Sequence, residues 1–99
     1  MDNFWTWGGD FFGYRKDDLL FTQRGKCVGK FNGDEIYGRD GKYLGEVMSE
    51  NRLITNISRK NQTASPAPNI SEVGCVGYIG YVGNVMYVGY EDFSAADKL

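Results

Sequence analysis

The residues best suited to acid–base chemistry are six carboxylates near the expected turns, namely Asp17, Asp18, Asp34, Glu35, Glu46 and Glu50. Two carboxyl groups about 5–10 Å apart, one with a raised pKa, would serve a small hydrolase or lyase, and clustered carboxylates also bind cations. Aspartate at a turn, however, commonly hydrogen-bonds the neighbouring backbone. We therefore predict solvated turn residues, no catalytic residue, no metal site and no cofactor. A carboxylate-dependent hydrolase or lyase is kept as an alternative function.

The cysteines offer no better catalytic candidate. The 99 residues contain no histidine, the side chain that most often acts as general base or metal ligand near neutral pH, so Cys27 has no imidazole to activate it. Cys27 and Cys75 are too few for a disulfide framework and form no CxxC pair. The first five residues, MDNFW, lack the basic and apolar regions of a secretory signal. We expect a non-enzymatic cytoplasmic protein with buried, reduced thiols.

Aromatic side chains form the candidate binding surface, which consists of Trp5, Trp7, Tyr14, Tyr78 and Tyr81. Stacked aromatic rings can hold sugars or unpaired bases. A small β domain also needs large side chains to fill its core, and strand alternation sends Trp5 and Trp7 to the same face. We therefore predict that most of the aromatic rings are buried and that some of the tyrosines reach the surface.

Glycines that recur every 16 residues predict the elements that carry these side chains. One column contains Gly9, Gly25 and Gly41, and a second contains Gly13, Gly29 and Gly45. Asp40–Gly41 is typical of a two-residue type I′ turn, and the first column is expected to mark the same turn in each row. The second column falls inside strands, where a repeated glycine usually marks a bulge or a close backbone approach.

Turns about every eight residues leave short strands and no window for a helix. The expected strands are 3–7, 10–15, 19–23, 26–31, 35–39, 42–47 and 52–57, followed by 73–82 and 85–91 joined at Gly83–Asn84. The predicted fold is all-β, an antiparallel meander of about eight short strands in four pseudo-symmetric hairpin units. Residues 1–93 are expected to form a single β domain with a mobile loop at 59–69, and residues 94–99 a frayed tail.

The repeating unit resembles that of the four-fold β-flower domain, a small bacterial module of four similar β units around a pseudo-four-fold axis. Rows such as YGRDGKYLGEV at residues 37–47 carry the similarity. It covers residues 4–54 and, more loosely, residues 73–90. The resemblance implies the fold and brings with it no established biochemical activity.

Charge and hydropathy narrow the possible partners. Residues 73–90 contain no charged side chain and approach the length of a membrane span, but their glycines and tyrosines make a poor spanning helix. We predict two buried strands there and no membrane insertion. The net charge of −2, with no strong cluster of Lys and Arg, predicts no nucleic-acid binding.

The function predicted from these observations is a non-enzymatic binding or interaction module, with self-association as one form of it. Repeated units present similar surfaces around an axis, which suits a ligand at the centre or assembly with further copies. The expected partner is accordingly a second copy or another protein. A further alternative is an accessory or immunity-type protein that binds the product of a neighbouring gene.

Overall fold

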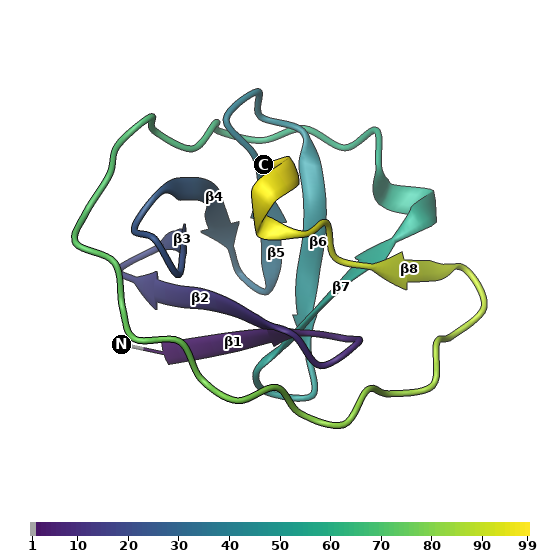
Figure 1. Cartoon of the computed structure of the whole chain (residues 1–99). Helices are drawn as coiled ribbons and strands as arrows, with labels where there is room; N and C mark the ends of the chain where they lie inside the picture. The colour runs from purple at the N-terminus through teal and green to yellow at the C-terminus, as the bar shows by residue number, and fades with distance from the viewer. Residues whose placement is uncertain (1) are drawn as a thin grey trace.

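The strands follow one another along the chain and pair in sequence order in the computed structural model, which describes residues 2–99 (Figure 1). The strands are β1 (Asp2–Thr6), β2 (Phe11–Lys16), β3 (Leu19–Thr22), β4 (Cys27–Asn32), β5 (Glu35–Tyr37), β6 (Tyr43–Met48), β7 (Arg52–Asn56) and β8 (Tyr90–Asp92). Two short 3-10 helices complete the elements, η1 (Ile57–Arg59) and η2 (Ala96–Lys98). The all-β class is therefore confirmed.

The sheet closes into a barrel because β1 also pairs with β7, and this pairing is parallel. Trp5 lies opposite Arg52, and the Trp5 amide donates to the Asn51 carbonyl at 2.9 Å. The predicted purely antiparallel meander is wrong, since β1–β7 form a closed seven-stranded mixed barrel and β8 adds to β7. Closure pairs the strand edges that an open meander would leave bare.

Each glycine of the first column follows a tight turn. The φ angles of Gly9, Gly25 and Gly41 are 103°, 88° and 78°, so all three adopt the left-handed region. The Gly41 amide donates to the Gly38 carbonyl at 3.0 Å, while Asp40 keeps a negative φ. The type I′ turn predicted at Asp40–Gly41 is therefore wrong. The geometry is that of a turn closed by a single left-handed glycine, with a bulge in the strand pairing beside it.

The second glycine column lies where neighbouring strands crowd together. A Cβ on Gly45 would stand 2.5 Å from the Ile54 carbonyl oxygen, and one on Gly29 would stand 2.6 Å from Cγ2 of Ile36. A Cβ on Gly13 would overlap the Phe21 carbonyl oxygen. A side chain at these positions would push adjacent strands apart.

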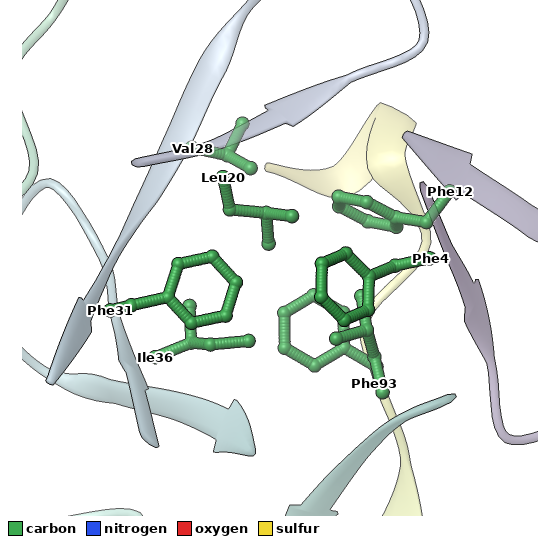
Figure 2. Packing of buried hydrophobic residues seen from close by; sticks show 8 residues of the cluster. Phe4, Phe12, Leu20, Val28, Phe31, Ile36 and Phe93 are labelled. Atoms are coloured by element: carbon green, nitrogen blue, oxygen red, sulfur yellow. The ribbon is translucent and has the colours of Figure 1, made fainter. Parts of the chain in front are cut away.

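Apolar side chains from successive strands meet inside the barrel and form its core (Figure 2). The cluster consists of Phe4, Phe12, Leu20, Val28, Phe31, Ile36, Leu53 and Phe93. Phe93 follows β8 and meets Phe12 edge to face at 5.3 Å. Ala96 and Leu99 pack against the same cluster. Within residues 94–99, which we expected to form a frayed tail, Ala96 and Leu99 are therefore packed against the core.

Residues 60–89 run around the outside of the barrel, and we call this segment the strap (Figure 1). The two strands predicted at 73–82 and 85–91 are wrong, since residues 72–87 carry no helix, strand or turn and β8 covers only Tyr90–Asp92. The loop expected to be mobile at 59–69 is joined to the barrel: the Tyr43 amide donates to the Gln62 carbonyl at 2.9 Å, and Ala67 is buried.

Candidate functional site

The strap docks on the three glycine turns in the same way. The carbonyl oxygens of Gly41, Gly25 and Gly9 accept backbone hydrogen bonds from Ala64, Glu72 and Tyr81 at 2.8, 2.7 and 2.8 Å. A Cβ on Gly25 would overlap the carbonyl oxygen of Glu72. The bare Cα of each turn therefore lets the strap approach the barrel backbone.

Two tryptophans at the end of β1 point outward and hold the strap by its main chain. Nε1 of Trp5 donates to the carbonyl oxygen of Ile79 at 3.0 Å. Nε1 of Trp7 donates to the carbonyl oxygen of Val85 at 3.1 Å. Both tryptophans are buried, so the strap covers the indole rings while it satisfies their N–H groups.

Arg52 adds a third donor from β7. Its guanidinium is buried and bonds the carbonyl oxygens of Trp7 at 3.1 Å and Val82 at 2.9 Å. The cation therefore joins β1 to the strap, and its hydrogen bonds compensate for removing the charge from water.

Tyr14 adds a fourth donor from β2. Its hydroxyl donates to the carbonyl oxygen of Val73 at 3.1 Å. The ring stacks on Phe21 at 5.3 Å with an interplanar angle of 10°. Burial, followed by the nearby Glu72 carboxylate, raises the pKa of Tyr14, which keeps the hydroxyl a donor.

The aromatic residues predicted as a binding surface fall into two places. Trp5, Tyr78 and Tyr81 come together, with the Trp5 ring stacked on Tyr81 at 4.2 Å and 6.0 Å from Tyr78. Trp7 lies against Tyr87 instead, at 5.6 Å, and Tyr14 belongs to the cluster around Phe21. Tyr78 and Tyr81 are about half exposed. The strap therefore covers Trp5, Trp7 and Tyr14, whereas Tyr78 and Tyr81 belong to the strap itself.

A row of exposed apolar side chains lies along the outside of the strap. We call it the apolar row, and it consists of Val73, Val76, Ile79, Val82, Val85 and Val88, which are between 82% and 103% exposed. These residues recur every third position, which is the period of a polyproline II helix. Glycines at the next position face the barrel, as at Gly80 and Gly83. The β-branched side chains therefore face solvent.

Our sequence analysis missed this row, although the signal is present. The triplets VGC, VGY, IGY, VGN, VMY and VGY follow one another from residue 73 to residue 90. The stretch was interpreted as two buried strands in preference to a membrane span, and neither structure has a period of three. A search for short internal repeats would have found it.

Four glutamates are paired with neighbouring side chains, and two of them, Glu35 and Glu46, are among the six candidate carboxylates. Glu35 pairs with Arg59, Glu72 pairs with Lys16 at 2.7 Å, and Glu91 pairs with Lys60 at 2.6 Å. Glu46 accepts a hydrogen bond of 2.7 Å from Tyr43. Within residues 2–99, no three His, Cys, Asp or Glu side chains gather in a group that could hold a metal ion.

The two thiols are free, Cys27 being buried and Cys75 half-buried. Burial raises the pKa of both. A raised pKa reduces the thiolate fraction near neutral pH, and the thiolate is the nucleophilic form.

The part of the chain from residue 2 to residue 99 has no helix long and apolar enough to cross a bilayer. Comparison with protein-family models, curated proteins and solved structures finds no match to this chain. The resemblance to the four-fold β-flower domain therefore stays a prediction. The geometry of the strap is the feature that bears on function. Its inner side covers the aromatic residues of the barrel, and its outer side carries the apolar row.

Proposed function

We propose that the protein is a non-enzymatic interaction module that associates with a second copy of itself through the apolar row. The observation that supports this is a run of six strongly exposed β-branched side chains at every third position of one segment. Single exposed apolar residues are common on soluble proteins, whereas contiguous rows mark interaction surfaces.

The row supplies a large part of the area that a dimer needs. Burying one such side chain is worth about 1.5–3 kcal/mol at about 25 cal/mol per Å², or roughly 60–120 Å². The six side chains therefore supply roughly 400–700 Å² per copy. The neighbouring half-exposed Tyr78, Tyr81 and Tyr87 extend the surface. A stable interface takes about 800 Å² from each partner.

A second copy suits the chemistry of this surface. Residues 73–90 contain no charged side chain. A charged partner would therefore find no opposite charge there, and burying its charges against this surface would cost their hydration. The row of another copy is equally apolar and equally uncharged. Two rows can therefore meet without bringing like charges together.

The spacing of the row fits a two-fold axis. Its six positions are symmetric about a midpoint between Ile79 and Val82. An antiparallel pair of straps would place Ile79 against Val82 of the partner subunit, and Val76 against Val85 of the partner subunit. Because both rows have a three-residue period, the contacts stay in register. Such a self-complementary patch is typical of two-fold dimers.

Sedimentation equilibrium of the purified protein tests the proposal. We expect a dimer for the wild type and a monomer for Ile79→Ser/Val82→Ser, with unchanged circular dichroism because these side chains touch solvent. Ile70→Ser is the matched control, since Ile70 lies in the strap outside the row and is 43% exposed. It should remain dimeric. A wild type that is monomeric at several hundred micromolar would reject the proposal.

A further inference from the structure

We propose that the outer face of the barrel formed by Trp5, Trp7, Tyr14 and Arg52 is a receptor for extended peptides, which the strap occupies as a ligand from the same chain. We call these four side chains the receptor face. The peptides it would take are uncharged and extended with a three-residue period, and they carry glycine at the second position of most triplets, as do five of the six triplets of residues 73–90. This site is separate from self-association, because it uses the inner side of the strap and not the apolar row.

The hydrogen bonds recognise a repeating main chain. The four donors bond the carbonyl oxygens of residues 73, 79, 82 and 85, whose positions differ by multiples of three. In a polyproline II helix, carbonyl oxygens three residues apart point to the same side. Aromatic grooves read proline-rich peptides in this conformation. Because the acceptors are main-chain atoms, any peptide with this period can present them.

Glycine supplies the selectivity of the receptor face. A Cβ on Gly80 would stand 2.7 Å from the carbonyl oxygen of Gly9, and one on Gly83 would stand 2.8 Å from that of Gly8. Both distances are shorter than real Cβ contacts allow, and the obstructing atoms belong to the barrel backbone. A ligand with alanine at these positions would be held away from the donors.

An aromatic residue after the glycine completes the recognition. The Tyr81 ring stacks on Trp5 at 4.2 Å with an interplanar angle of 17°. The Arg52 guanidinium lies 5.1 Å from the Tyr81 ring centroid, and it also donates a hydrogen bond to the carbonyl oxygen of Val82. Cation–π and stacking contacts of this kind favour a tyrosine at that position of the triplet.

The strap can leave this site without disturbing the main core cluster. It contributes Ala67 and the partly buried Cys75 to a second, smaller cluster around Tyr14, which its release would open. The main core cluster takes its buried residues from β1–β5, β7 and Phe93, and the strap contributes none of them. Residues 72–87 also lie outside every strand of the sheet. A tethered ligand has an effective concentration of about millimolar, so an added peptide competes only in excess or when the strap is weakened.

The test uses a synthetic peptide of residues 72–90 with two added lysines for solubility, and the full-length Gly80→Ala/Gly83→Ala protein. Weakening the strap should expose Trp5 and Trp7 and shift tryptophan fluorescence to longer wavelength. The peptide should reverse this shift. It should bind the Gly80→Ala/Gly83→Ala protein at least tenfold more tightly than it binds the wild type. The peptide carrying Gly80→Ala/Gly83→Ala should bind at least tenfold more weakly. It keeps the apolar row, so it also controls for binding through self-association.

The matched protein control is Ile79→Ala/Val82→Ala, which changes solvent-facing side chains of the same triplets and should leave the emission unchanged. Equal binding of the two peptides, or no reversal by either, would overturn the proposal. If the glycine variant fails to fold, the wild type is titrated to millimolar peptide while the indole N–H signals of Trp5 and Trp7 are followed by NMR. Shifts of both signals with the glycine peptide alone support the receptor face, and unmoved signals overturn it.

Discussion

The indole N–H of Trp5 donates to the carbonyl oxygen of Ile79 at 3.0 Å, across 74 positions of sequence. This bond joins the first strand of the barrel to the middle of the strap. It places the Ile79 side chain outward, where it is 90% exposed. At this position the strap therefore covers Trp5 on its inner side and exposes a member of the apolar row on its outer side.

Removing the Trp5 donor should loosen the strap. In Trp5→Phe the ring remains aromatic, while the Ile79 carbonyl loses its partner at a cost of about 1–2 kcal/mol in the free energy of unfolding. Hydrogen exchange of the Tyr81 amide, which bonds the Gly9 carbonyl at 2.8 Å, should accelerate more than exchange in β3 and β4. Equal acceleration throughout the barrel would mean that the bond does not act locally on the strap.

A Cβ at a docking turn should cost more than a Cβ at an open turn. Gly25→Ala combines a φ of +88° with overlap of the Glu72 carbonyl, and we expect a loss of about 2–4 kcal/mol. Gly33 has a φ of +63° but nothing within 4 Å of the added Cβ, so Gly33→Ala should cost about 1 kcal/mol. Urea unfolding measures both. Similar losses of stability in the two variants would show that the strap does not pack closely enough on the Gly25 turn to oppose an added Cβ.

The sequence analysis predicted the first half of the chain well. Each of β1–β7 begins and ends within two residues of the predicted strand, because Gly turns and alternating side chains are local signals. No local signal in the sequence indicates the parallel pairing of Trp5 with Arg52. This pairing closes the strands, which we predicted as an antiparallel meander, into a barrel.

The second half was predicted less well for a different reason. An uncharged run of Val, Gly and Tyr has the composition typical of strands. In the strap, however, every third residue faces the barrel, so the two-residue alternation of a strand is absent. Phe93 was likewise placed in no element, although it packs on Phe12. Of the five residues predicted as a binding surface, Trp5, Tyr78 and Tyr81 lie close together. No local pattern indicated that the strap would pack on the tryptophans.

Truncating Phe93 should open the core. The side chain is buried against Phe12 and closes one end of the barrel, and we expect Phe93→Ala to lower the free energy of unfolding by about 3–5 kcal/mol. Ser94→Ala, which changes an exposed side chain at the next position, should stay within about 0.5 kcal/mol of the wild type. Thermal unfolding followed by circular dichroism compares them. A stable Phe93→Ala protein would contradict the role given to the C-terminal residues.

Stability should fall above about pH 10. Burial, together with the hydrogen bond to Glu46, raises the pKa of Tyr43 above its usual value of 10.0. Above pH 10 the unfolded chain releases this proton while the folded protein retains it, so the stabilisation present below pH 10 is lost as pH rises. Urea unfolding from pH 8 to 11 should show a decline for the wild type and a smaller decline for Tyr43→Phe. Identical declines would assign the effect to other groups.

Disulfide cross-linking between two copies tests most directly whether two apolar rows face each other. Ile79→Cys and Val82→Cys are each made in a Cys75→Ala background, and the two proteins are oxidised separately and as a mixture. The antiparallel arrangement predicts a covalent dimer mainly in the mixture, because position 79 faces position 82 of the partner subunit. Equal yields in the separate samples would contradict the antiparallel pairing, and the absence of covalent dimer from all three samples would contradict self-association through the row.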